Sequence, residues 1–353
     1  MVIVATLVAQ TIVSMASLTL PVLAPALAEV LDVDASTIGY QVSIVYAGAM
    51  ASAAVGGGVV ARLGACRATQ AALAFVGAAM LFAMAPYLAA LVVASLMLGF
   101  GYGISNPAGA HLLTRFTPAS SRNLIFSLKQ TGVPLGGMAA ALVAPPVAHV
   151  FGWRAALAVV LGCAIAMLAL LQTVRAGWDD DRLSPGRQGE AREGARAGPG
   201  VLGGIALVWA RRELRYLSLM ALCFAGVQLC LMTFAVTFLV REAHYTLVEA
   251  GVLLSMVQFA GAAGRIVWGW IADRLRASRT TLLVLGALML LATIATTQID
   301  ETWSAAATAV VFVSMGATAI GWNGVFLAEV ARLAPAGEAS TATGGALFFT
   351  FGG

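Results

Sequence analysis

The chain has 353 residues, of which 60% are hydrophobic and only 10% are charged, and its formal net charge is +4. A soluble domain carries charge on roughly a quarter of its residues, so this composition excludes a water-soluble protein. No polar segment combines a stripe of basic residues with interleaved aromatic residues, which excludes a nucleic-acid partner. The composition therefore predicts an integral membrane protein that has the lipid bilayer as a partner.

Segments long enough to cross a bilayer recur along the whole chain. A hydrocarbon core about 30 Å thick requires about 20 apolar residues in a helix. This criterion predicts ten full spans and the start of an eleventh near residue 340; the ten cover residues 1–26, 36–61, 69–86, 88–113, 123–148, 153–174, 216–240, 246–272, 280–298 and 303–330. The first is interpreted as a spanning helix and not as a cleaved signal peptide, because no basic segment precedes it.

One long polar stretch, residues 175–215, separates the two apolar halves. It begins near the run Asp179-Asp180-Asp181 and is then rich in Arg, Gly, Pro and Glu, so we expect most of it to be disordered. Its last part, from Leu207 to Arg215, predicts a short helix on the membrane surface. Arginines concentrate in the loops on the same side as this stretch, and the positive-inside rule therefore places it and the N-terminus in the cytoplasm.

The two halves repeat each other. Three residues at the end of one apolar segment recur at the same spacing in the other half, as Gly57, Arg62 and Arg67 and as Gly269, Arg274 and Arg279. A second set does the same, as Gly99, Asn106 and Arg115 and as Gly316, Asn323 and Arg332. Internal duplication of an apolar chain is typical of membrane transporters, whose repeats surround a central site.

The loop after the second span of each half resembles a signature of the major facilitator superfamily, of the form G-x-x-x-D-R-x-G-R. The residues that match it, and that we expect to form a gating motif, are Gly57, Arg62, Gly64, Arg67, Gly269, Asp273, Arg274 and Arg279. Ala61 stands where the first loop should carry its acid. An acid at a helix end with arginines beside it can hold neighbouring helices together in one access state. The alternative is that these arginines only anchor the helices to anionic lipid.

This resemblance implies an all-α integral membrane fold with two six-helix bundles. The first bundle is expected at residues 1–174, a cytoplasmic linker with a short interfacial helix at 175–215, and the second bundle at 216–353. By the repeat, the chain stops within the eleventh helix, so the second bundle is expected to be incomplete by about 40 residues. The fifth span also carries Gly132, Pro134, Gly136 and Gly137, a loose version of an antiporter motif, and its proline is expected to bend the helix.

Two basic residues lie inside predicted spans, Lys129 in 123–148 and Arg265 in 246–272. A charge in a membrane helix costs on the order of 2.5–3.5 kcal/mol even on lenient insertion scales. We interpret the pair as a clamp for an anionic substrate, and an arginine in the eighth span also resembles the monocarboxylate-type branches of the family. Two alternatives stay open: both side chains extend to the cytoplasmic interface, or Arg265 binds carbonyls of neighbouring helices.

Uncharged polar residues occupy the spans that line the central cavity in the resembled fold. Those expected to contact substrate are Gln10, Tyr102, Asn106, Gln228, Trp322 and Asn323. The alternative for each is a hydrogen bond between helices, which typically contributes under about 1 kcal/mol.

These features predict a monomeric secondary transporter in a bacterial inner membrane, and not an enzyme. It would move a small organic anion such as a monocarboxylate by alternating access, with a coupling ion such as a proton. A multidrug/proton antiporter and a truncated, non-transporting membrane protein are the two alternatives. No deep carboxylate is found for the antiporter, because Glu329 lies near a helix end. The four cysteines have no metal-ligand spacing, and no metal or cofactor is expected.

Overall fold

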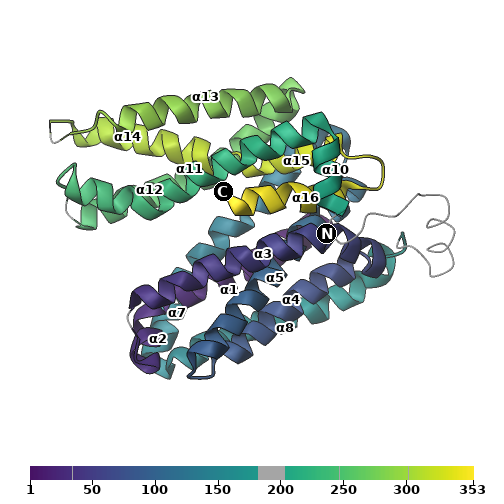
Figure 1. Cartoon of the computed structure of the whole chain (residues 1–353), viewed down its shortest axis with the longest axis horizontal. Coiled ribbons are helices and arrows are strands. Elements are labelled where there is room, and N and C mark those ends of the chain that lie inside the picture. The colour runs from purple at the N-terminus through teal and green to yellow at the C-terminus, as the bar shows by residue number, and fades with distance from the viewer. Residues whose placement is uncertain (34, 182–202, 246, 301) are drawn as a thin grey trace. The chain divides into compact units, whose positions relative to one another are not determined.

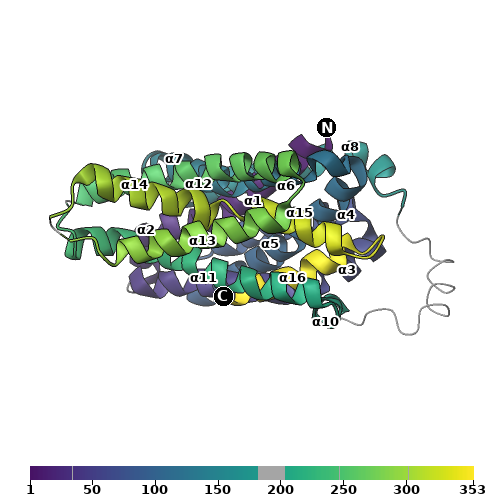
Figure 2. The ribbon, with the colours of Figure 1, turned by 90° about the horizontal axis from the view of Figure 1, so that it is seen from above.

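The computed structural model describes residues 1–33, 35–181, 203–245, 247–300 and 302–353, and these residues form helices and no strands. The N-terminal helices are α1 (Val2–Val22), α2 (Ala24–Leu31), α3 (Ala35–Leu63), α4 (Ala65–Ala83), α5 (Leu88–Phe116), η1 (Ala119–Ser121), α6 (Arg122–Gln130), α7 (Gly132–Phe151) and α8 (Trp153–Trp178). The C-terminal helices are α10 (Gly203–Ala210), α11 (Arg212–Arg241), α12 (Leu247–Leu275), α13 (Ser278–Thr296), α14 (Ala305–Met315), η2 (Gly316–Ile320), α15 (Asn323–Leu333) and α16 (Ala339–Gly352). Figures 1 and 2 show their arrangement.

Ten helical segments in the described part of the chain are long and apolar enough to cross a membrane, which confirms the predicted number of full spans. Two of them are interrupted. The fifth span breaks at Thr131, between α6 and α7, and the tenth contains the π-helical turn η2 between α14 and α15. The break at Thr131 precedes Pro134 by three residues and agrees with the expected bend, whereas Pro145 and Pro146 lie inside α7 without ending it.

The described helices group into two compact units. Unit 1 contains residues 1–116, 132–218 and 330–352, and unit 2 contains residues 117–131 and 219–329 together with Gly353. In unit 1, α5 packs against α1, α3 and α4, α4 packs against α8, and α1 packs against α7 (Figure 1). In unit 2, α12 packs against α6, α13, α14 and η2. The predicted bundle boundaries at 174 and 216 stay a prediction.

The polar stretch between the halves is described only at its two ends. Its first acids, Asp179 to Asp181, directly follow α8, and its last part forms α10, which packs against α16 within unit 1. The Arg212–Arg215 run opens α11 and is not part of a separate surface helix. The disorder expected for the middle of the stretch concerns residues 182–202, which lie outside the described residues.

Small residues set the closest helix contacts. Ser127 of α6 lies between Gly269 of α12 and Gly324 of α15, and a Cβ on either glycine would come closer than 3.0 Å to Ser127. Gly136 of α7 approaches the backbone of α1 at Thr11 and Met15 in the same way. Such close packing between backbones is how membrane helices associate without a hydrophobic driving force.

Candidate functional site

Unit 2 brings the two predicted cations to one residue, Gln130. The Lys129 Nζ donates to the Gln130 side-chain Oε1 at 3.3 Å, and the Arg265 Nη1 donates to the Gln130 backbone carbonyl. The Nε of Arg265 donates to the carbonyl of Ile320 at 3.0 Å. Both cationic side chains are 2% exposed and are therefore buried in the structure. The two positive charges lie close enough to repel each other.

The carbonyls that Arg265 contacts belong to the two interrupted helices. Proline has no N–H, so Pro134 cannot bond the carbonyl four residues before it, which is that of Gln130. At η2 the wider π-helical turn shifts the backbone bonding pattern, and two of its carbonyls accept hydrogen bonds from side chains. Trp268 Nε1 donates to Ala317 O at 3.0 Å, beside the bond from Arg265 to Ile320. Arg265 thus binds carbonyls of neighbouring helices, which is one of the two alternatives to the anion clamp. The anion clamp itself stays a prediction.

The predicted polar residues of unit 2 form one cluster around Gln228 of α11. Its side-chain oxygen accepts from Trp322 Nε1 and from Asn323 Nδ2, each at 3.2 Å. Trp322 is fully buried and its ring packs edge-on against Phe224, 5.5 Å between centroids. Because the Gln228 oxygen accepts two bonds, the orientation of its amide is fixed by the protein.

The predicted polar residues of unit 1 form a corresponding cluster around Gln10 of α1. The Gln10 oxygen accepts from Ser105 Oγ of α5, and its nitrogen donates to Ser14 Oγ, both at 3.3 Å. Asn106, the next residue of α5, is buried, and Tyr102 is half-buried one turn earlier. In both units, therefore, a glutamine is hydrogen-bonded to the segment that carries the repeated asparagine: Gln10 to α5 with Asn106, and Gln228 to Asn323.

The loop motif of the second half caps a helix. The carboxylate of Asp273, near the end of α12, accepts from Asn123 N at 3.1 Å, from Asn123 Nδ2 at 2.8 Å and from Leu124 N at 2.8 Å. These groups open α6, where the unbonded amides carry a partial positive charge that a carboxylate stabilises. Asp273 therefore fixes the start of the helix that carries Lys129.

Replacing Asp273 with alanine is expected to destabilise the protein by about 2 kcal/mol, because it removes a charged cap from α6. The apparent melting temperature in detergent should fall by about 5 °C. The matched control is Glu242→Ala, which removes an exposed acid of the same unit. Equal melting temperatures for the two variants would contradict the capping role.

The loop motif of the first half lies beside an acid from the end of α8. Asp179, which follows α8, accepts from Cys66 N at 2.7 Å and from Arg67 N at 3.1 Å and so caps α4. Gly64 ends α3 with a φ of +90°, and a Cβ there would overlap the Asp179 side chain. Arg62 and Arg67 have exposed side chains, and Gly57 packs against Thr341 of α16. A carboxylate therefore also lies at this loop, but Asp179 caps the helix that directly follows the loop, whereas Asp273 caps α6.

Several functional contacts had no clear signal in the sequence. Nothing in the sequence indicates that Gln130 joins the two cations, and the composition of residues 175–215 predicts disorder for the acidic run 179–181. In the structure Asp180 and Asp181 pair with Arg115, and Asp181 also lies 2.8 Å from His111 Nε2. Glu329, which is 1% exposed, pairs with Arg279 of the loop motif at 2.9 Å. The last arginine of the motif, Arg274, is exposed.

The glycine motif of the fifth span serves packing in the structure. Gly132 and Gly136 lie against the backbone of α1, and Gly137 lies against the Leu18 side chain. Within the described ranges, no group of three His, Cys, Asp or Glu side chains converges as metal ligands would.

Comparison with known proteins agrees with this architecture. The model of the Major Facilitator Superfamily matches residues 4–353. Two uncharacterized MFS-type transporters, MT3072 and Rv2994 from two strains of Mycobacterium tuberculosis, are 29% identical over 175 residues, 50% of this chain. The matched segment is only 36% of the length of each of these relatives.

Solved transporter structures share the fold at low sequence identity. The proton:xylose symporter XylE, bound to 6-bromo-6-deoxy-D-glucose, has a TM-score of 0.72 at 16% identity, covering 99% of this chain and 85% of its own. A bacterial homologue of the iron transporter ferroportin, in an outward-facing state, has a TM-score of 0.73 at 15% identity, covering 100% and 89%. The E. coli fucose:proton symporter FucP has a TM-score of 0.72 at 13% identity, covering 99% and 88%. Since the family model matches nearly its whole length, and ten described helices are long and apolar enough to cross a membrane, the chain belongs to the Major Facilitator Superfamily and is a multi-pass membrane protein.

Proposed function

We propose that the chain is a secondary transporter of a small organic anion, such as a monocarboxylate. The observation that carries the proposal is the contact of two buried cations, Lys129 and Arg265, with the same residue, Gln130. Charged residues inside membrane spans are costly and typically mark substrate or ion pathways. Two of them side by side repel each other, and a bound carboxylate would reduce that repulsion.

The contacts of Arg265 suit it to this role. A guanidinium carries five N–H donors in a planar fork that matches a carboxylate. Its bonds to Gln130 and Ile320 engage the Nη1 and Nε groups and hold the plane of the fork. A substrate carboxylate would then meet a preoriented group, which lowers the entropic cost of binding.

Transport is proposed to follow alternating access, with a proton as the coupling ion, and the protein is proposed to act as a monomer. The excess of arginine in alternate loops supports a cytoplasmic N-terminus in a bacterial inner membrane. The clusters around Gln10 and Gln228 are proposed to contact the uncharged part of the substrate.

A multidrug/proton antiporter is the main alternative, and it is weakened by the position of the acids. Among the described residues the buried acids are Asp179 and Glu329; Asp179 caps α4, and Glu329 pairs with Arg279 near the end of α15. A proton-coupled exporter of cations generally requires a carboxylate deep in a span. The second alternative, a membrane protein that does not transport, is decided by the assay below.

The test is uptake of labelled monocarboxylates into proteoliposomes that contain the chain. We expect saturable uptake that excess unlabelled carboxylate inhibits and that the matched neutral amide does not inhibit. An inward proton gradient should accelerate it. Transport of a cationic dye without carboxylate uptake would support the exporter, and absence of all transport would support the non-transporting alternative.

A further inference from the structure

An exposed cluster of basic and aromatic side chains lies where α10 meets α11, within unit 1. We call it the basic–aromatic patch, and its members are Trp209, Arg211, Arg212, Arg215 and Tyr216. Its two large rings, Trp209 and Tyr216, are 52% and 55% exposed. None of the roles predicted for the substrate site or for the loop motifs uses this patch.

Ring contacts hold the arginines of the patch in place. The guanidinium carbon of Arg215 lies 5.6 Å from the ring centroid of Trp209 and 5.7 Å from that of Tyr216. The guanidinium carbon of Arg212 lies 5.5 Å from the same Tyr216 centroid. A ring contacts the face of a guanidinium, so the N–H groups at its edge can still donate. Among the described residues, no carboxylate forms an ion pair with Arg211, Arg212 or Arg215, so the patch offers charged donors to an anion.

The patch lies at one end of a candidate membrane span. The segment of α11 that is long and apolar enough to cross a membrane begins at Arg212 and ends at Ala235. Aromatic and basic side chains at such a position lie at the level of the lipid headgroups. Further along α11, Leu219 and Cys223 follow Tyr216 at helical spacing and are also exposed. A phosphate would therefore meet the arginines while an acyl chain meets apolar side chains, which favours a phospholipid over a free phosphate.

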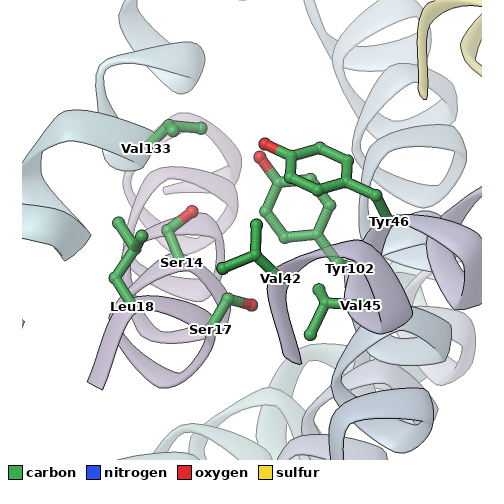
Figure 3. A pocket seen from close by; sticks show the side chains of 8 residues that line it. All are labelled: Ser14, Ser17, Leu18, Val42, Val45, Tyr46, Tyr102 and Val133. Carbon is green, nitrogen blue, oxygen red and sulfur yellow. The ribbon is translucent and has the colours of Figure 1, made fainter. Parts of the chain in front are cut away.

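The patch is supported from behind by α16, another helix of unit 1. The ring of Trp209 stacks on Phe349, with 6.0 Å between centroids. Phe351, two residues later and therefore on nearly the opposite side of α16, packs against the rings of Tyr46 and Tyr102 at 6.0 and 5.7 Å. These two tyrosines line the cavity of unit 1, whose lining residues are all uncharged (Figure 3). Ring contacts on both sides of α16 favour a preformed patch, and the cavity offers an anion no competing charge.

We propose that the basic–aromatic patch binds the headgroup of an anionic phospholipid. The phosphate accepts hydrogen bonds from the guanidinium groups of Arg212 and Arg215, and an acyl chain lies along Leu219 and Cys223 of α11. Glu213 is the one acid between residues 209 and 216 and leaves this segment with a net charge of +2, so a negative headgroup is preferred to a zwitterionic one. This site does not depend on which solute is transported.

The test is binding of lipid to the delipidated protein, measured by native mass spectrometry in a non-ionic detergent. The two probes are phosphatidylglycerol and phosphatidylcholine with the same acyl chains, so that only the headgroup differs. Each basic residue near an anionic headgroup contributes about fivefold to affinity. For the parent we therefore expect the first phosphatidylglycerol to bind about tenfold more tightly than the first phosphatidylcholine.

The first pair of variants tests the charges. Replacing both Arg212 and Arg215 with glutamine is expected to weaken binding of phosphatidylglycerol about 20-fold and to leave binding of phosphatidylcholine nearly unchanged. The matched control replaces Arg154 and Arg241 with glutamine. It also removes two arginines, both exposed and one of them in contact with a tryptophan ring, but neither belongs to the patch. This control should retain the affinity of the parent.

The second pair of variants tests the rings. Trp209→Leu keeps an apolar side chain but removes the ring that contacts Arg215, and it should weaken binding of phosphatidylglycerol about threefold. Trp270→Leu is the matched control, because Trp270 of α12 is 55% exposed and Trp209 is 52% exposed. In the described ranges no arginine lies over the ring of Trp270.

Loss of phosphatidylglycerol binding in the patch variants but not in their controls would support the site, and three results would overturn it. Equal affinity of the parent for the two lipids would show that the patch does not select headgroup charge. Equal affinity of the two arginine double variants for phosphatidylglycerol would show that binding does not depend on the patch. Displacement of bound phosphatidylglycerol by inorganic phosphate at the same concentration would assign the patch to a soluble phosphate-bearing ligand.

Discussion

Monocarboxylate uptake is expected to fall about 100-fold when Arg265 is replaced by glutamine, because a charged hydrogen bond contributes about 1.5–3 kcal/mol. The variant removes the guanidinium that donates to Gln130 and Ile320 and that we propose binds the substrate. Initial rates in proteoliposomes over a range of substrate concentrations give the loss, and they separate KM from the maximal rate. An anion-binding role raises KM, whereas a purely structural role lowers the maximal rate through loss of folded protein.

Two further variants make this test specific. Arg265→Lys retains the charge but not the planar fork, and is expected to retain folding with KM raised about tenfold. Lys129→Gln should also raise KM, since the Lys129 ammonium contacts the side chain of Gln130, the residue whose backbone carbonyl Arg265 binds. Arg241→Gln, at an exposed arginine that ends α11, is the control. If Lys129→Gln and Arg265→Lys both keep the parent KM, the cations serve only to bind the interrupted helices.

Replacing Gly324 with alanine is expected to destabilise unit 2 by about 3 kcal/mol or more, the range of strong overpacking. The added Cβ would lie closer than 3.0 Å to the Cα as well as to the Cβ and Oγ of Ser127. A flexible side chain could move away, but here the backbones of α6 and α15 would have to separate. The fraction of monodisperse protein after detergent extraction and its melting temperature measure the effect.

The control for this prediction is Gly58→Ala. Gly58 also lies within a long helix, but a Cβ there meets no atom within 4 Å. Alanine should stabilise that helix by up to about 1 kcal/mol. Shortening Ser127 to alanine should not rescue Gly324→Ala, because the Ser127 Cα remains in the way. Full rescue, or equal stability of the Gly324 and Gly58 variants, would show that the contact is looser than described.

Much of the fold follows from local properties of the chain. The ten spans could be placed from runs of apolar residues, because each membrane helix must satisfy its own backbone and face lipid regardless of its neighbours. The loop motif at Asp273 could be found because its residues lie close together in the chain and resemble the signature of the superfamily. The break in the fifth span could be expected from Pro134, but the π-helical turn at Gly316–Ile320 could not, since nothing in the residue types fixes that register.

The candidate site was only partly predictable. Lys129 and Arg265 stand out because each is a charge in an apolar segment, and their depth along two helices could be estimated. Their meeting at Gln130 depends on how α6, α12 and η2 pack, which no periodicity encodes. Asp179 lies in a stretch whose composition predicts disorder. Its role in capping α4 arises only because α8 ends beside that helix.

The sequence by itself therefore determined that the chain is an all-α membrane protein with an internal repeat and the motifs of its superfamily. These properties depend on residues close together in the chain and on transfer of single helices into lipid. Only the tertiary structure decided which carbonyls Arg265 binds, which carboxylate caps α4 and where the cavity of unit 1 lies. Those contacts join residues from separate helices, and the close packing that glycine and serine residues allow between the helices sets their geometry.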